Sequence, residues 1–238
     1  MPALSIGSKE WKQLVYDGAR EMGVALEMAM AGKMAAHCIE LIRWNQKVNL
    51  TAITDPMDVA VKHVLDSLAA YSLLPDGASV LDLGSGGGFP GLVLKIANPG
   101  LSVVMVDASR KKVSFLKHVI RSIKLKDIEA YHIRADDLAK NSAFVNAFDI
   151  IVSRALSAMD TLVETALPLL AKKGMIIALK GIAPEAEIES MRSLIIKRLR
   201  FSEINSDNLS VIVKNYTLPY LEIARSLVTV RKLGSSPN

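Results

Sequence analysis

Short apolar runs and amphipathic segments alternate along the middle of the chain, and this alternation predicts the fold. The apolar runs predict five strands, at residues 79–84, 102–107, 128–133, 148–153 and 174–180. Between them, the spacing of hydrophobic residues favours helices over residues 89–97 and 109–124, near 157–172 and near 184–198. Strands that alternate with helices are typical of a mostly parallel sheet with helices on both faces.

The N-terminal part of the chain follows a different pattern. Residues 8–43 contain many helix-forming residues and no proline, which predicts one or two helices with a break near Gly23 or Gly32. Asp55, followed directly by proline, is a good start for a further helix that runs towards Leu74.

The C-terminal part again contains apolar runs, without a long helix between them. Two of these predicted strands could pair as a hairpin that ends the sheet in antiparallel fashion. We therefore expect a Rossmann-like α/β sheet, mostly parallel with an antiparallel C-terminal strand, plus N-terminal helices. Residues 1–54 would form a helical extension, and residues 55–238 the α/β domain.

Composition narrows the class of protein. The chain has 238 residues, of which 50% are hydrophobic and 22% charged, so it can bury a core and is not intrinsically disordered. Cys38 is the single cysteine, which excludes an intrachain disulfide. Neither a signal-peptide pattern nor an uninterrupted apolar stretch of spanning length is present, so we expect a cytoplasmic protein without a membrane partner. Since no histidines and cysteines cluster at metal-ligand spacing, we expect no metal site.

Positive charge is concentrated in one segment. The net charge of the chain is +5, but residues 110–134 alone contain eight lysines and arginines against two acidic residues. This segment therefore carries more positive excess than the whole chain. Such a patch suits a polyanionic partner, although a solvated helix face is an equally simple interpretation.

A glycine-rich loop, VLDLGSGGGFPG, follows the first predicted strand and begins a helix. Gly84 and Gly86 fit a dinucleotide-binding fingerprint, but its third position is Phe89, where close packing normally needs glycine or alanine. The alternative pattern, acidic-x-G-x-G-x-G, is complete, with Asp82, Gly84, Gly86 and Gly88. This second pattern is that of enzymes that bind S-adenosylmethionine. The acidic residues at the ends of the neighbouring strands favour it.

Acidic residues stand at the ends of three successive strands, where ligands bind in open α/β sheets. Asp82 could hold the amino group of the methionyl portion, directly or through water. Asp107 could accept hydrogen bonds from both ribose hydroxyls, and Asp136, after Ala135, from the adenine amino group. The simpler alternative is three surface acids beside glycines that serve only as turns.

The sequence also limits the methyl acceptor. Methyl transfer from a sulfonium is an in-line displacement whose main requirement is alignment. The loop after the fourth strand reads Ser153-Arg154-Ala155 and lacks the Asn/Asp-Pro-Pro-aromatic motif used for exocyclic amines. Cys38 lies in the N-terminal helices, which argues against cytosine C5 methylation. Ring nitrogens remain, and guanine N7 needs no deprotonation; carboxyl, hydroxyl and protein acceptors stay open.

Seven segments in order resemble the bacterial 16S rRNA guanine-N7 methyltransferase family G, also called glucose-inhibited division protein B. The resemblance covers residues 44–181, with a further match at residues 225–228. Its segments are Trp44-Asn45, Asn49–Ile53, His63 with Asp66-Ser67, Asp82–Gly91, Arg134–Asp136, Phe148-Asp149 with Ser153–Ala155, and Lys180-Gly181.

The resemblance implies an S-adenosylmethionine-dependent enzyme that methylates N7 of one guanine in 16S rRNA, with the small ribosomal subunit as substrate. It implies cofactor contacts by Gly84, Phe89, Ala135-Asp136 and Arg154, to which the strand-end and loop arguments add Asp82, Gly86 and Asp107. It implies catalytic positions at Arg154 and Lys180, and RNA contacts at Lys111, Lys112 and Arg225. We expect a monomer without a DNA partner.

Several assignments have alternatives. Arg154 either forms a structural ion pair or places a guanidinium between cofactor and base, and Lys180 is either an exposed lysine or an RNA contact. His63 and Asp66, spaced i, i+3, either pair on the helix surface or hold residues 49–51 over the cofactor. A methyltransferase with another substrate, and a non-catalytic RNA-binding protein, are the two alternative functions.

Overall fold

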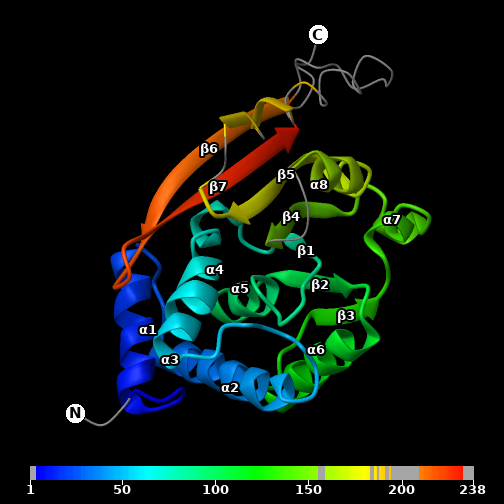
Figure 1. Ribbon diagram of the computed structural model, residues 1–238. Coiled ribbons are helices and arrows are strands. Elements are labelled where there is room, and N and C mark those ends of the chain that lie inside the picture. Colours follow the sequence, from blue (N-terminus) through cyan, green and yellow to red (C-terminus); the bar gives the residue numbers. More distant parts are fainter. Residues whose placement is uncertain are drawn as a thin grey trace.

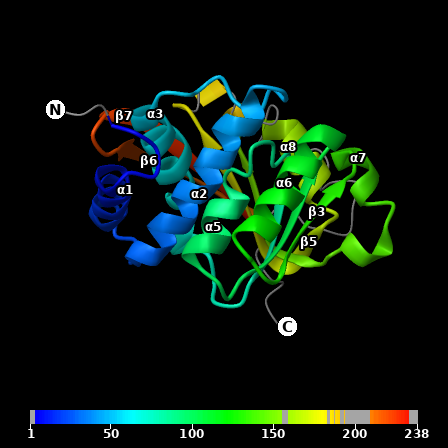
Figure 2. The ribbon, with the colours of Figure 1, turned by 90° about the horizontal axis from the view of Figure 1, so that it is seen from below.

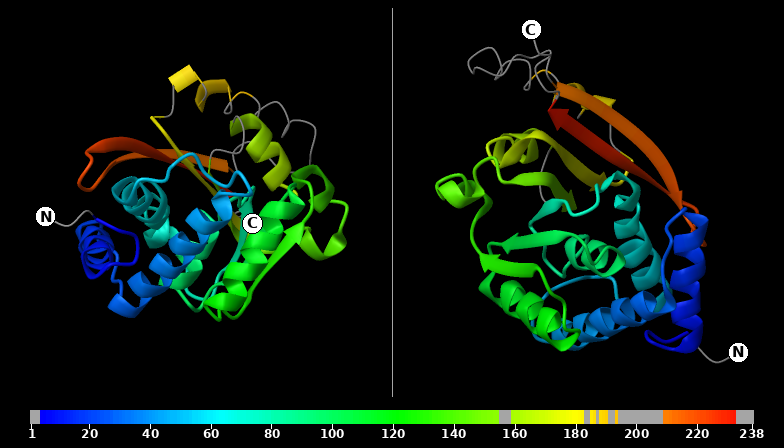
Figure 3. Two further views of the ribbon diagram at one scale, coloured as in Figure 1. Left: turned by 60° about the horizontal axis from the view of Figure 1, so that its bottom comes forward. Right: turned by 180° about the vertical axis from the view of Figure 1, so that it is seen from behind.

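The computed structural model describes residues 4–154, 159–182, 185, 186, 188–190, 193 and 209–232. Among these residues, seven strands form one sheet in the order β3-β2-β1-β4-β5-β7-β6 (Figure 1). The strands are β1 (Ser79–Leu83), β2 (Ser102–Asp107), β3 (Ile128–His132), β4 (Phe148–Arg154), β5 (Leu170–Lys180), β6 (Leu209–Leu218) and β7 (Ile223–Lys232). Strands β1 to β5 are parallel, and β7 runs antiparallel to β5 and β6. The predicted fold class and the C-terminal hairpin (Figure 3) are confirmed.

Helices of three types accompany the sheet. The α-helices are α1 (Lys9–Glu21), α2 (Met28–Asn45), α3 (Pro56–Asp58), α4 (Asp66–Leu68), α5 (Gly91–Ala97), α6 (Arg110–Ser122), α7 (Ala135–Leu138) and α8 (Met159–Ala166). The described residues also contain a π-helix, η1 (Val59–Leu65), and two 3₁₀ turns, η2 (Tyr71–Leu73) and η3 (Ser142–Phe144). Within the described ranges, none of these helices is long and apolar enough to cross a bilayer.

The end of the sheet differs from the prediction in one element. A helix was expected near residues 157–172, but α8 ends at Ala166 and β5 already begins at Leu170. Leu170 pairs with Phe148 of β4, and a shift of register separates this pair from the regular ladder further along. Tertiary pairing therefore overrides the helical spacing of this apolar run. The helix expected near 184–198 lies mostly outside the described residues.

The core has two parts, one on each face of the sheet. Because successive side chains of a strand point to opposite faces, alternate residues of one strand belong to different parts. In β5, Ile177 and Leu179 pack towards α2 and α5, whereas Ile176 and Ala178 pack towards α8. In β4, Ile150 and Val152 lie on the face towards α2 and α5. Arg154, two residues after Val152, is therefore on the same face.

The N-terminal helices share the larger part of the core with the sheet. Trp11 of α1 is fully buried, and its indole nitrogen donates a hydrogen bond to the carbonyl oxygen of Pro56. Helix α2 lies between α1 and α6 (Figure 2). The chain turns at Gly23, which has a φ of +77°, whereas Gly32 lies inside α2. The proposed boundary between residues 54 and 55 therefore separates segments that pack in one core.

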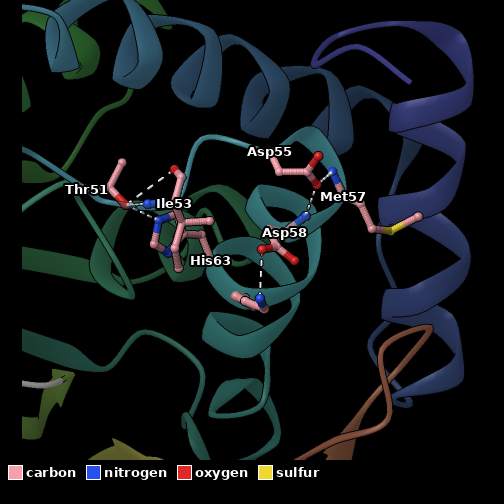
Figure 4. A network of polar contacts seen from close by, with 7 residues as sticks. Thr51, Ile53, Asp55, Met57, Asp58 and His63 are labelled. Carbon is pink, nitrogen blue, oxygen red and sulfur yellow. Dashed lines mark hydrogen bonds and ion pairs between the residues drawn. The ribbon is translucent and has the colours of Figure 1, made fainter. Parts of the chain in front are cut away.

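The helix expected from Asp55 to Leu74 is divided. Asp55 caps its start as predicted, with its carboxylate accepting hydrogen bonds from the backbone of Met57 and Asp58 (Figure 4). After one turn the chain becomes the π-helix η1, and it ends in the 3₁₀ turn η2. Such π segments are frequent at functional sites. Here the carbonyl oxygen of Lys62 accepts a hydrogen bond from Arg154, 2.8 Å away.

Candidate cofactor and catalytic site

The glycine-rich loop leaves β1 and folds back against β2. The backbone nitrogens of Gly84 and Ser85 both donate to the carbonyl oxygen of Val106 in β2. Gly84, Gly86 and Gly88 have positive φ, of 73°, 53° and 87°, which side chains disfavour. The sequence therefore needs glycine at these positions to form the loop at all, whatever the loop binds.

Asp82 stands under this loop and is fully buried. Its Oδ2 accepts a hydrogen bond from the backbone nitrogen of Gly91 at 2.9 Å, whereas its Oδ1 has no hydrogen-bond partner among the described residues. Burial raises the pKa of this carboxyl to about 7. A buried carboxylate oxygen without a partner is costly, and a cationic group would stabilise it. The atom fits the predicted contact with an ammonium group.

Asp107, at the end of β2, is tied to the same loop. Its Oδ2 accepts from the backbone nitrogen of Gly86 at 3.0 Å, and its Oδ1 accepts from that of Ser109 at 2.8 Å. A carboxylate has about four acceptor positions, so each oxygen can still receive a hydroxyl. The two backbone contacts fix the orientation of the carboxylate, and its contact with a ribose stays a prediction.

A pocket of about 340 Å³ opens beside Asp107. Gly84, Asp107 and Ala135, three of the predicted cofactor residues, line it together with Thr161 and Leu162 of α8. The pocket thus joins the carboxyl ends of β1, β2 and β3, as expected for a nucleoside at this edge of the sheet. Asp136 follows Ala135 in α7, but its side chain lies outside the described part of the structure.

Phe89, at the far end of the loop, is enclosed by cationic and aromatic groups. His63 stacks on its ring at 4.5 Å and 18°, and His37 stacks on it at 4.7 Å and 29°. The Arg154 guanidinium lies 5.1 Å from the centre of the same ring. His37 also contacts the loop directly, with Nε2 2.7 Å from the carbonyl oxygen of Gly87. Burial lowers the pKa of His37 to about 4, so the ring is neutral and Nε2 donates.

Arg154 is held from several directions at the end of β4. Besides Lys62, His63 receives a hydrogen bond from the guanidinium, with Nη2 and Nδ1 3.0 Å apart. The carboxylate of Asp66 lies 3.5 Å from Nη1. Burial raises the pKa of Asp66 and lowers that of Arg154. Both alternatives for Arg154 are therefore compatible with the structure: it pairs with a buried carboxylate, and it stands beside the glycine-rich loop.

A profile of the family described as rRNA small subunit methyltransferase G, or GidB, matches residues 30–212. The chain belongs to this family. The family resemblance inferred from the sequence is thereby confirmed.

Curated relatives agree over nearly the whole chain. Ribosomal RNA small subunit methyltransferase G from Thermoanaerobacter sp. (strain X514) is 38% identical, over 94% of this chain and 91% of its own length. The protein of the same name from Geobacter sp. (strain M21) is 39% identical, over 92% and 96%. The O-methyltransferase from Bacillus cereus, solved in complex with SAH, has a TM-score of 0.58 at 17% identity, over 94% and 99%. That last likeness shows the methyltransferase fold.

In this member of the methyltransferase G family, Lys180 and Arg154 lie on different faces of the sheet. Arg154 follows the strand positions that pack towards α2, whereas Lys180 follows Ile176 and Ala178, which pack towards α8. Strand alternation therefore separates the two predicted catalytic side chains, although both stand at carboxyl ends of neighbouring strands.

The predicted RNA-contact residues occupy two different environments. Lys111 and Lys112 lie in the first turn of α6, where Lys111 is exposed and Lys112 half-buried. Arg225, in β7, faces inwards, with Nε 3.6 Å from Oδ1 of Asp66 and its side chain 24% exposed. Arg225 is therefore part of the polar cluster around Arg154, and the two lysines lie on the outer surface.

The sequence did not mark all the residues that the structure brings together. His37 lies in a helix with apolar neighbours, and no spacing indicated its contact with the glycine loop. Tyr216, in β6, donates a hydrogen bond to Asp66 at 2.8 Å across 150 residues. His63 is buried, so it is not on the helix surface, and it forms a hydrogen bond with Thr51 (Figure 4). That it holds residues 49–51 over the cofactor stays a prediction. The described residues contain no group of His, Cys, Asp and Glu able to hold a metal.

Proposed function

We propose that this family member transfers the methyl group of S-adenosylmethionine to N7 of a guanine in 16S rRNA of the small ribosomal subunit. The observation that carries the proposal for this chain is the buried, unpartnered Oδ1 of Asp82 beneath a glycine loop whose Gly84, together with Asp107, lines a pocket of about 340 Å³. Family membership supplies the substrate, because the relatives are named as methyltransferases of small-subunit rRNA.

The described residues fit the cofactor along its length. Asp82 would hold the ammonium group, Asp107 the ribose hydroxyls, and the pocket beside Ala135 the adenine. When bound, S-adenosylmethionine supplies a methyl group activated by its sulfonium. The positive φ of Gly86 and the open space at its Cα leave room for the methionyl portion to approach the backbone.

Guanine N7 is an acceptor that suits this set of residues. Its lone pair forms the new bond to the methyl carbon while the carbon–sulfur bond breaks, and the electron pair stays on sulfur as a thioether. No proton has to leave, so no general base is required. His63 could not serve as one, since both of its ring nitrogens are engaged in hydrogen bonds.

Arg154 would orient the reactants rather than stabilise N7. The methylated base becomes cationic, so a guanidinium directly at N7 would oppose the reaction. We place Arg154 instead against guanine O6, a phosphate or the cofactor carboxylate, all of which accept its planar donors. Burial lowers the pKa of Arg154, but a guanidinium is not deprotonated in proteins.

The first turn of α6 is the proposed RNA contact. Arg110, Lys111 and Lys112 stand there without an acidic residue among them. Cations at a helix N-terminus lose about 0.3–1 kcal/mol each against the helix dipole, so they do not serve helix stability. Their charge and that of the helix end add, which favours phosphate binding. We further propose that the protein is cytoplasmic, because an enzyme that acts on ribosomal subunits requires access to them. We also propose that it is a monomer.

The test is transfer of labelled methyl groups from S-adenosylmethionine to undermethylated small ribosomal subunits. Borohydride and aniline treatment would then cleave the RNA at any N7-methylguanine. We expect a single cleavage in 16S rRNA, with no incorporation by the Gly86→Arg variant. Incorporation without cleavage would overturn the N7 assignment. No incorporation into subunits, naked rRNA or lysate would favour a non-catalytic RNA-binding protein.

A further inference from the structure

His63 occupies a bridging position between the segment after α2 and the guanidinium of Arg154. Its Nδ1 lies 3.0 Å from Nη2 of Arg154, and its Nε2 lies 2.8 Å from Oγ1 of Thr51 (Figure 4). A guanidinium has only donors, so Nδ1 must accept and cannot carry a proton. The ring proton is therefore on Nε2, which donates to Thr51. The hydrogen bonds alone define one neutral tautomer of His63.

Thr51 provides a fixed anchor for this tautomer. Its hydroxyl oxygen also accepts from the backbone nitrogen of Ile53 at 2.9 Å. The side chain of Asn45 holds the backbone around it, accepting from Leu50 and Thr51 at 2.8 and 3.0 Å and donating to the carbonyl oxygen of Thr51 at 2.9 Å. The position of Nε2 is therefore set by a closed turn rather than by a mobile side chain.

The plane of the His63 ring is fixed as well. It stacks on Phe89, which belongs to the cofactor loop, at 4.5 Å and 18°. The ring is buried, and the nearest charged and titratable groups on neighbouring elements are Arg154, on β4, and His37, on α2. Burial and, after it, these two groups lower the pKa of His63 to about 3, so the Nδ1 lone pair persists at physiological pH.

Among the described residues, the guanidinium has two other acceptors, both on its Nη1: the carbonyl oxygen of Lys62 at 2.8 Å and the carboxylate of Asp66 at 3.5 Å. Asp66 lies on its Nη1 side and is itself bound by Tyr216 at 2.8 Å and paired with Arg225 at 3.6 Å, both from the β6–β7 hairpin. His63 thus adds an acceptor on Nη2 to the two acceptors on Nη1. Fixed acceptors on both nitrogens define the orientation of a planar fork better than acceptors on one nitrogen alone.

We propose that His63 is a positioning residue for methyl transfer. Its neutral Nδ1 fixes the Arg154 guanidinium at the carboxyl end of β4, in the orientation that aligns the guanine or the cofactor carboxylate. This inference rests on the proposed function, because Arg154 has a reactant to align only if methyl transfer occurs.

Three substitutions separate the two hydrogen bonds of the ring. His63→Phe keeps a ring on Phe89 and removes both bonds. His63→Gln can place its amide near Nε2, so it keeps a bond to Thr51 but offers Arg154 no acceptor. His63→Asn can place its carbonyl oxygen near Nδ1 and restores the acceptor. If the role of His63 were purely structural, the methylation rates of these variants would follow the order of their stabilities.

We expect the Phe and Gln variants to lower kcat for methylation of small subunits by about 100-fold, the loss typical of a displacement of about 1 Å. The Asn variant should recover at least about tenfold of this loss, whatever the order of the melting temperatures. Wild-type kcat in His63→Phe, or an equal loss in Asn and Gln variants that remain folded, would overturn the proposal.

A second measurement does not depend on activity or on folded variants. Long-range ¹H–¹⁵N correlation spectra of the wild-type protein report which ring nitrogen of His63 carries the proton. Between about pH 6 and pH 8 we expect protonated Nε2 and unprotonated Nδ1. The opposite tautomer, or an imidazolium, would overturn the inference. If wild-type protein methylates no rRNA while the spectra show the expected tautomer, the proposed function fails and the geometry of His63 stands.

Discussion

Gly86 and Gly88 lie two residues apart in the glycine-rich loop, and we expect alanine at each position to separate cofactor binding from folding. Both have left-handed backbone, with φ of +53° and +87°. A Cβ on Gly86 would meet only the carbonyl oxygen of Gly84, at 3.8 Å. A Cβ on Gly88 would lie 2.4 Å from Cδ1 of Leu92 and 3.1 Å from Nε2 of His37. Only the second substitution therefore collides with the protein.

The structure gives the size of each effect on stability. Gly86→Ala should cost about 1–2 kcal/mol, the strain of a side chain in left-handed backbone. Gly88→Ala adds an overpacking cost of about 1–3 kcal/mol. At about 2–4 °C per kcal/mol for a domain of this size, the melting temperature should fall by about 4 °C for Gly86→Ala and about 10 °C for Gly88→Ala.

Cofactor affinity should follow a different order from stability. The open space at Gly86 is where we place the methionyl portion, so Gly86→Ala should weaken S-adenosylmethionine binding by about tenfold or more, and Gly86→Arg should abolish it. Differential scanning calorimetry measures the melting temperatures, and isothermal titration calorimetry measures the cofactor affinities. Equal melting temperatures for the two alanine variants would refute the packing argument. Unchanged cofactor affinity in Gly86→Arg would refute the site itself.

Three further predictions concern Asp82, the two lysines at the start of α6, and His37. The pKa of Asp82 is raised to about 7, so the folded protein binds a proton that the unfolded chain releases above its ordinary pKa of about 4. Stability without cofactor should therefore fall as the pH rises from about 4 to about 7, and thermal melts of Asp82→Asn should lack this slope. The double substitution of Lys111 and Lys112 by alanine should weaken RNA binding and reduce its dependence on log salt by about 2, with unchanged cofactor affinity; an unchanged slope would exclude phosphate contacts there. His37→Phe should keep the aromatic stack but lose the hydrogen bond to Gly87, worth about 1 kcal/mol, and so weaken cofactor binding about fivefold by calorimetry; wild-type affinity would contradict a role for α2 at the loop.

The elements that sequence patterns predicted well are those whose signal is local. Strands β1 and β2 appear at the apolar runs that predicted them, and α6 begins and ends within two residues of its expected bounds. The helix at Asp55 starts as predicted, because the capping carboxylate and the backbone it binds are neighbours in the chain. Asp82 and the loop glycines could be recognised because one short segment contains all of them.

Other features could be decided only by contacts between distant segments. The early start of β5 depends on the pairing of Leu170 with Phe148, which no helical or strand period encodes. The inward orientation of Arg225 depends on where the hairpin places β7 relative to Asp66 of α4. Lys180 and Arg154 look equivalent as basic residues after strands, and only the packing of the two sheet faces separates them.

The sequence by itself therefore determined the order of strands and helices, the glycine loop and the family, since each depends on residues close together in the chain or on motifs in a fixed order. The tertiary structure decided which side chains surround Arg154. His63 approaches it from a π-helix, whereas Tyr216 secures its partner Asp66 from a strand 150 residues away. Hydrogen bonds act over about 3 Å, and only folding brings such residues within that distance.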